Sequence, residues 1–184
     1  TDPSMISQWI LSSTRYFEDS DLSFFYNTNP RIAKSTLMTL KNDSHDEFGL
    51  RYGISGEGSD MAFYAGQLVP NDAIINLTDG LVYATPYQLL GLGMNKAFDD
   101  YLLKFDVAYK HNLQQNRSGQ FVKVDRIDWD LAFDIQKNDR TILISVNSQY
   151  LLDFYSDYLT PTLTGSVSAD KNSTTYMARV NDKF

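Results

Sequence analysis

The side chains best able to do chemistry are charged groups that recur at alternate positions in two successive segments. The first segment carries Lys104, Asp106 and Lys110, and the second carries Arg126, Asp128, Asp130 and Asp134. Alternate side chains of an extended chain point to one side, so both sets share a sheet face if the segments pair as an ordinary hairpin. Around an aqueous passage, opposed acids and bases set a transverse field that selects solutes by charge. The alternative is a solvated face of mixed charge without selectivity.

Motifs for catalysis or metal binding are missing from the sequence. It has no GxSxG, HExxH or P-loop motif, and its two histidines, His45 and His111, occur in polar segments without acids at ligand spacing. Carboxylates such as Asp128 and Asp130, two residues apart on one strand face, lie about 7 Å apart, and we expect both to be hydrated. The GLG sequence at residues 91–93 fits small residues on a crowded sheet face better than a nucleotide fingerprint. We therefore expect no enzyme, no cofactor and no metal site.

The composition is that of one folded domain rich in aromatic residues. The 184 residues are 42% apolar, 21% charged and 14% aromatic. A net charge of −7 argues against a nucleic-acid partner, because phosphate binding needs a basic surface. The absence of cysteine excludes disulfides and thiolate metal sites. No apolar run reaches the roughly 18 residues of a membrane-spanning helix, whereas strands of a membrane barrel need apolar residues only at alternate positions.

From residue 47 onward, apolar and polar residues alternate, which is the signature of β-strands. The clearest apolar faces comprise Tyr101, Leu103, Phe105, Val107 and Tyr109 in one segment, and Ile127, Trp129, Leu131, Phe133 and Ile135 in the next. Ser148 interrupts the apolar face of the segment that follows, and the faces of segments 61–69 and 87–95 are ambiguous. We expect eight consecutive antiparallel strands in one sheet, at residues 47–55, 61–69, 87–95, 101–111, 125–136, 141–152, 162–169 and 174–182.

The connections between these segments alternate in length. The short ones cover residues 56–60, 96–100, 137–140 and 170–173, and the longer ones cover residues 70–86, 111–122 and 153–161. An up-and-down membrane barrel has tight turns at one end and long loops at the other. A soluble sandwich with Greek-key crossovers has no reason to produce this alternation.

Strand length favours the same fold. The segments of about 9–12 residues suit a tilted membrane strand better than the usual soluble strand of about 5–6. Tyr101 and Tyr109 bracket an aliphatic stretch on one face. Eight residues at about 3.3 Å each, tilted by about 40°, span about 20 Å of membrane height. This spacing is close to that of two aromatic girdles.

Residues 1–46 are harder to interpret. Ser4 could cap a short helix whose apolar face carries Ile6, Trp9, Ile10 and Phe17. Equally, residues 22–27 could end a strand that a long polar loop follows at residues 28–46. We favour a strand or partial strand followed by an outer loop.

The segments EFGLRYG, YATPYQLLGLG, LLKFDVAYKHN, VDRIDWDLAFDI and ILISVNSQYLL, read in order, resemble a family of proteobacterial outer-membrane proteins. That family is described only as a domain of unknown function, and its members are long porin-like barrels. The resemblance covers about residues 47–184. Its motifs are soft and rest on Glu47, Phe48, Gly49, Arg51, Tyr52, Asp128 and Gln149. It implies no catalytic residue.

Together these features predict an all-β, antiparallel, up-and-down transmembrane β-barrel. Residues 47–184 would form a barrel segment that is trimmed at both ends, after a less defined region at residues 1–46. The expected function is a porin-like channel or export conduit in the outer membrane of a Gram-negative bacterium, with lipid and small solutes as partners. One alternative is a soluble periplasmic or extracellular all-β module that binds glycans or other ligands. Another is an outer-membrane barrel enzyme, for which the sequence supplies no catalytic set.

Overall fold

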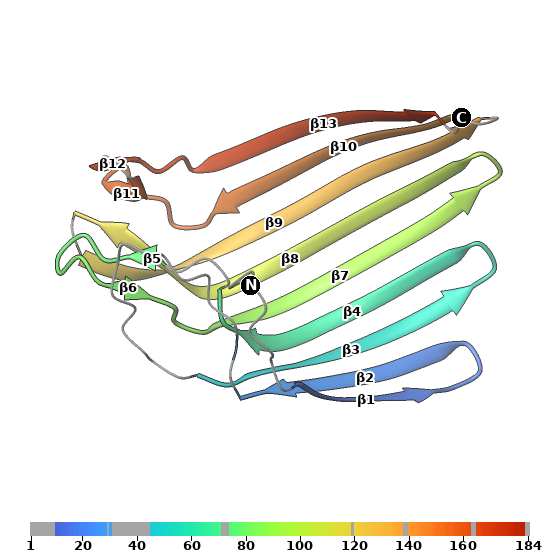
Figure 1. Cartoon of the computed structure of the whole chain (residues 1–184), viewed down its shortest axis with the longest axis horizontal. Coiled ribbons are helices and arrows are strands. Elements are labelled where there is room, and N and C mark those ends of the chain that lie inside the picture. The colour runs from blue at the N-terminus through green and yellow to red at the C-terminus, as the bar shows by residue number, and fades with distance from the viewer. Residues whose placement is uncertain are drawn as a thin grey trace, which may run out of the picture.

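Nine strands of the chain form one antiparallel sheet in which successive strands are neighbours (Figure 1). The computed structural model describes residues 10–28, 30, 45–70, 74–118, 120–137, 140–162 and 165–182. The strands, in their order across the sheet, are β1 (Ile10–Tyr16), β2 (Ser20–Asn27), β3 (Glu47–Gly56), β4 (Ser59–Leu68), β7 (Tyr87–Phe98), β8 (Tyr101–Arg117), β9 (Gln120–Lys137), β10 (Arg140–Leu151) and β13 (Asn172–Asp182). The described part of the chain is therefore all-β and antiparallel. Within it, no helix is long and apolar enough to cross a membrane.

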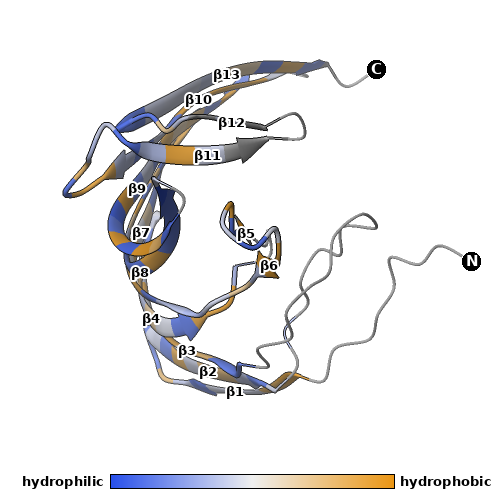
Figure 2. Cartoon of the chain, turned by 90° about the vertical axis from the view of Figure 1, so that its left-hand side faces the viewer, coloured by the Kyte–Doolittle hydropathy of each residue, from blue (hydrophilic) through white to orange (hydrophobic). Residues whose placement is uncertain are grey.

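The sheet is strongly curved but not closed. Figure 2 shows it as an arc, with β1 at one end and β13 at the other. Glycines on the concave side make room for aromatic rings that lie flat on the sheet. A Cβ atom on Gly49 would overlap the ring of Phe25, and Cβ atoms on Gly91 and Gly93 would lie 3.6 Å and 3.5 Å from Tyr64. The predicted crowding of this face holds at Gly93, where a Cβ atom would lie 2.5 Å from Asp106 Oδ1, but not at Gly91, where the contacts would be ordinary ones.

Seven of the eight predicted segments are neighbouring strands of this sheet, and one is not. The segment predicted at residues 162–169 belongs instead to a hairpin of β11 (Tyr158–Thr162) and β12 (Gly165–Ser168) within the connection from β10 to β13. β13 pairs directly with β10. Alternation indicates a strand but not its partner, and Pro161 removes a ladder donor from β11. The hairpin pairs with the sheet where Tyr158 and Leu159 face Arg117 and Asn116 at the end of β8.

The prediction of a connecting loop at residues 111–122 is also wrong. β8 and β9 continue through it to a tight turn, so these strands are 17 and 18 residues long. A bulge lies between Lys110 and Leu113, and Asn112 within it has a φ of 63°. The extra residue shifts the alternation by one position. Because of this shift, the alternation of apolar and polar residues in the sequence does not reveal that the strand continues.

Short and long connections alternate along the sheet except between β8 and β9, where the expected long connection is a short one, so the predicted alternation is wrong at this point. Tight turns join β1 to β2, β3 to β4, β7 to β8 and β9 to β10, and all of them lie at one end of the sheet (Figure 1). The long connection from β4 to β7 contains a small hairpin of β5 (Ile74–Ile75) and β6 (Val82–Tyr83), which lies on the concave side (Figure 2).

The N-terminal region begins with two strands in its described part. β2 confirms the prediction of a strand that ends at residue 27, and the helix alternative is wrong for Ile10, which begins β1. Ser4, Ile6 and Trp9, and most of the loop predicted at residues 28–46, lie outside the described residues.

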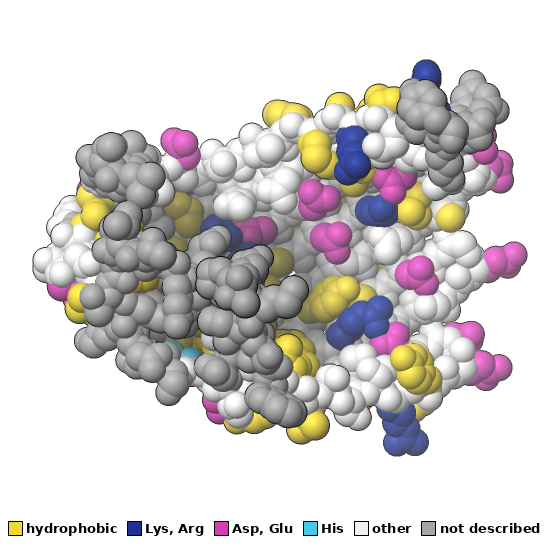
Figure 3. Space-filling model, in the orientation of Figure 1, with side chains coloured by type: hydrophobic (Ala, Val, Ile, Leu, Met, Phe, Trp, Pro, Cys, Tyr) yellow, Lys and Arg dark blue, Asp and Glu magenta, His cyan; other side chains and the backbone are white. Residues whose placement is uncertain are grey.

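Strand register separates the two faces of the sheet. One row across it contains Ile54, Met61, Met94, Phe105, Leu131, Val146 and Tyr176. The adjacent row contains Asp21, Gly53, Ala62, Gly93, Asp106, Asp130, Asn147 and Thr175. Rows of these two kinds alternate along the strands, which resolves the ambiguous faces of β4 and β7. Figure 3 looks onto the concave face and shows its acidic and basic side chains around a central hollow.

Most large apolar side chains of the sheet are not buried. Among the described residues, the buried apolar set is small and lies mainly near the long connections: Val69, Val82, Ala84, Val124 and Tyr158, with Ala62 and Ala132 on the sheet itself. By contrast, Leu50, Leu90 and Ile144 on the convex face are 51%, 59% and 50% exposed. The convex face is therefore an uncovered apolar surface.

Candidate functional site

The candidate site is the polar concave face of the sheet. Lys104, Asp106, Lys110, Arg126, Asp128, Asp130 and Asp134 all lie on this face, in register across β8 and β9. The rows run at right angles to the strands, so these side chains form a band across the wall of the hollow seen in Figure 3. The expectation that the two charged segments share a face agrees with this register.

Five of these seven side chains, three basic and two acidic, form ion pairs with one another. Lys104 Nζ lies 2.5 Å from Asp134 Oδ2. Asp128 lies between two cations, with Lys110 Nζ and Arg126 Nε both 2.6 Å from its carboxylate oxygens. Lys110 and Arg126 face each other directly across the strands. The Asp128 carboxylate therefore relieves a repulsion between like charges that would destabilise the hairpin.

Asp106 and Asp130 form the exception. They are directly opposite on β8 and β9, and no lysine or arginine of the described residues forms an ion pair with either. Two like charges in facing positions destabilise a sheet. The middle of this face thus carries two carboxylates that no described side chain neutralises through an ion pair.

The structure adds an ion pair that the sequence did not reveal. Arg51 Nη1 lies 2.5 Å from Oδ2 of Asp21, on the concave face of β3 and β2. Tyr64, next to Arg51 in the same row, also faces the concave side. The alternation of Arg51 with Gly49 and Gly53 in the sequence indicates that Arg51 lies on the polar face of its strand. The partner was missed because Asp21 lies in the region whose pattern is hard to interpret.

The residues expected to face lipid lie on the opposite, convex face. They are Tyr101, Leu103, Phe105, Val107, Tyr109, Ile127, Trp129, Leu131 and Phe133. Tyr101 and Phe133 are 53% and 42% exposed. Ser148, the polar exception on this face, is 3% exposed, and its hydroxyl contacts Asn172 and Thr174 of β13. Hydrogen bonding to neighbours makes this polar group tolerable on an apolar face.

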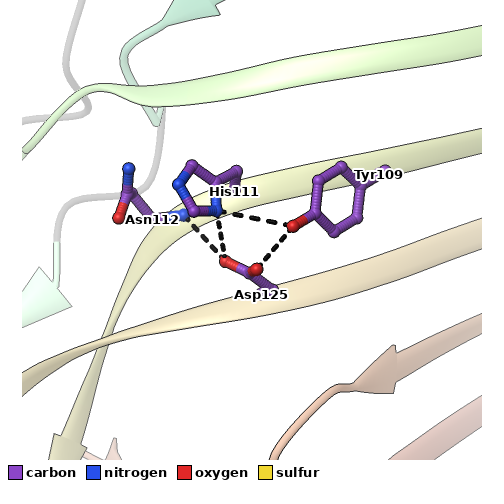
Figure 4. Close-up of polar contacts among 4 residues, drawn as sticks. All are labelled: Tyr109, His111, Asn112 and Asp125. Carbon is purple, nitrogen blue, oxygen red and sulfur yellow. Dashed lines mark hydrogen bonds and ion pairs between the residues drawn. The ribbon is translucent and has the colours of Figure 1, made fainter.

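A hydrogen-bonded cluster lies at the bulge of β8 (Figure 4). Asp125 accepts hydrogen bonds from the Tyr109 hydroxyl at 2.5 Å and from the Asn112 amide at 3.2 Å, and His111 Nδ1 lies 2.8 Å from the same carboxylate. The expected surface position of His111 agrees with its 44% exposed side chain, but the histidine does have an acidic neighbour. In the described ranges, no group of three or more His, Asp or Glu residues could hold a metal ion.

Arg117 and Asn116, at the end of β8, contact the two long connections that contain the β11–β12 and β5–β6 hairpins. The Arg117 guanidinium binds the Asp157 carboxylate at 2.9 Å and lies 3.8 Å from the centre of the Tyr155 ring. The hydrogen bond from the Ser118 hydroxyl holds the pKa of Asp157 below its ordinary value. Arg117 also lowers this pKa, whereas burial acts in the opposite direction. Asn116 is fully buried; its amide donates to the Ile75 carbonyl at 2.8 Å and accepts from the Leu77 amide at 3.2 Å.

We expect Asn116→Ala to release the β5–β6 hairpin from the concave side. The change leaves two half-buried backbone groups without these partners, at up to about 1–3 kcal/mol each. Hydrogen exchange at the Leu77 amide measures the release. Gln115→Ala is a matched control, because Gln115 instead donates to the Leu159 carbonyl in β11. Unchanged Leu77 protection in Asn116→Ala would show that Asn116 does not hold the hairpin.

Comparisons of the chain with family models, curated protein sequences and solved structures found no match.

Proposed function

We propose that this chain forms the wall of a β-barrel channel in a bacterial outer membrane, with its convex face against lipid and its concave face lining a solute passage. The observation that carries the proposal is the separation of the faces by register. Rows of apolar side chains cover the convex face, and rows of charged and small side chains cover the concave face. This is the arrangement of a membrane barrel with a polar interior.

The exposed apolar surface supports a lipid environment. Large side chains exposed on the convex face include Leu50, Phe63, Leu90, Ile144 and Val180. Soluble monomers rarely expose contiguous apolar patches larger than a few hundred Å². A soluble barrel or sandwich would instead place these side chains in a core. No second sheet covers the convex face within the described residues.

Aromatic residues lie at both ends of the apolar band. Phe98 and Tyr101 face each other near the tight turns, and Tyr109 and Tyr150 both pair with Ile127 near the long connections. Tyrosine rings favour the boundary between lipid and water. The height between them, about 20 Å from strand rise and tilt, suits the apolar band of an outer-membrane barrel.

Insertion into a membrane requires that the outer edges of β1 and β13 be paired. Unpaired backbone groups in the hydrocarbon region cost several kcal/mol each. The described part of the chain supplies no strand to either outer edge. In an antiparallel path, the first and ninth strands run in the same direction. An all-antiparallel closure therefore adds an odd number of strands between them.

The charge of the wall favours cations. Outside the extension of β8 and β9 beyond the bulge, the concave face carries seven acidic and five basic residues. They are Asp21, Glu47, Asp60, Asp106, Asp128, Asp130 and Asp134, against Arg51, Lys104, Lys110, Arg126 and Arg179. Acidic side chains that line a pore favour cations over anions. We infer a passage with a moderate preference for cations.

Membrane extraction tests the lipid-facing assignment. The protein should sediment with membranes through high-salt and carbonate washes and be recovered folded only in detergent. Salt removes proteins that bind a membrane through surface charge, because it screens such contacts. Recovery of a monodisperse, folded protein from aqueous buffer alone would contradict the proposal and favour a soluble binding module.

A further inference from the structure

Two hollows lie side by side on the concave face and share Tyr64 and Leu89 as a common wall. The first, of about 350 Å³, extends over β2, β3 and β4, and the second, of about 340 Å³, extends over β7, β8 and β9. Both are large enough for part of a small organic molecule. Both linings are mostly apolar, but the second also contains carboxylates, and this difference indicates the kind of molecule that would occupy both.

The first hollow is apolar and electrically neutral. Phe25, Leu68 and Leu89 contribute apolar surface on its concave side, and Gly49, which the Phe25 ring covers, and Gly66 lie in its floor. Its charged member, Arg51, is already paired with Asp21. This hollow therefore suits an apolar group and gives no attraction to an anion or a cation.

The second hollow carries three carboxylates on a lining that is otherwise mostly apolar. Asp106, Asp128 and Asp130 line it, above the small residues Gly91 and Ala108. Asp128 is neutralised by Lys110 and Arg126. Asp106 and Asp130 have no cationic partner among the described residues, so the field in this hollow attracts a cation. The ring of Tyr64 lies between the two hollows, and aromatic faces attract organic cations.

We propose that the two hollows form one binding site for an amphipathic organic cation. Its apolar group lies in the first hollow, and its ammonium group reaches Asp106 and Asp130 across Tyr64. β4 and β8 are two strand spacings apart, so the two groups of the ligand are separated by about 10 Å or more. This assignment rests on the proposed channel function, and it names the solute class of that passage.

Equilibrium binding to the full chain tests the site directly. Phenylalkylamines with two, four and six methylenes are titrated into the protein in nanodiscs, beside the matching neutral phenylalkanols and butylamine. We expect affinity to rise with chain length for the amines and to exceed that of each matching alcohol by tenfold or more. Butylamine, which lacks the apolar group, should bind weakly.

Substitutions test the contributions of the carboxylates and of the apolar surface separately. Asp106→Asn combined with Asp130→Asn should lower amine affinity at least tenfold and leave alcohol binding unchanged. Leu89→Ser should weaken amines and alcohols alike. Asp60→Asn is the matched control, because Asp60 lies on the same concave face but lines neither hollow. Equal binding of amines and alcohols, or amine affinity unaffected by the double variant, would overturn the assignment.

Conductance in KCl, measured on the same protein, distinguishes a failure of the proposed amine site from a failure of the proposed channel function. A conducting protein that does not prefer the amines retains its channel function and loses only this ligand class. Selective amine binding without conductance supports the site and contradicts the channel.

Discussion

Leu131→Arg is expected to destabilise the membrane-inserted protein by about 2–4 kcal/mol, whereas Leu131→Ala should be nearly neutral. Leu131 lies on the convex face midway between the rows of Tyr101 and Tyr109, and its neighbours are Phe105 of β8 and Val146 of β10. In this position an arginine must enter the middle of the hydrocarbon layer. Lipid fills the space left by the alanine variant, so no internal cavity forms. In a packed protein core the same truncation costs about 2–5 kcal/mol.

Reversible denaturant titration in lipid vesicles measures both free energies of unfolding. The depth of the substituted residue in the membrane provides an internal control. Arginine at Tyr101, near the tight turns, should cost close to zero, because the penalty falls towards the membrane boundary. If Leu131→Ala and Leu131→Arg are both severely destabilising, Leu131 is a core residue and its lipid-facing position is wrong.

Asp130→Arg is expected to shift ion selectivity strongly towards anions without preventing folding. Asp130 faces Asp106 across the strands, and both lack a cationic partner in the described residues. Arginine changes the charge of this position by two units and brings a base opposite Asp106, which also removes a repulsion between like charges. The negative charge in the middle of the wall is then neutralised.

The reversal potential in a salt gradient measures this shift. Asp130→Asn should give an intermediate value, because it removes the acid without adding a base. Asn147→Arg adds a base in the neighbouring position of the same row and should shift selectivity in the same direction. A reversal potential that is identical across the Asp, Asn and Arg series would mean that this face does not line the passage.

Much of the fold could be predicted from the sequence because alternation is a local property of each strand. The positions of β3, β4, β7, β10 and β13 follow from it closely. Two features did not follow. The bulge at Asn112 depends on one extra residue that reverses the alternation, and the β11–β12 hairpin depends on which strand a segment pairs with. Neither is encoded in the period of the pattern.

The candidate site was predictable only as a face. Register brings Asp106 opposite Asp130, as expected for an ordinary hairpin. The ion pairs depend on side-chain reach between rows, so Asp128 binding both Lys110 and Arg126 could not be read from spacing. Asp21 was missed because β2 contains Phe24 and Phe25 in succession, with one on each face, which obscures its alternation.

Lipid quenching of Trp129 fluorescence tests most directly which face meets the membrane. The chain has two tryptophans, so Trp9→Phe makes Trp129, on the convex face, the only reporter. In vesicles of brominated phospholipid, we predict strong quenching of Trp129 and little effect of aqueous iodide. Moving the reporter one position, with Trp129→Phe and Asp130→Trp, should reverse this preference. Protection of Trp129 from brominated lipid, or lipid quenching of the reporter at position 130, would contradict the assignment of the convex face to the membrane.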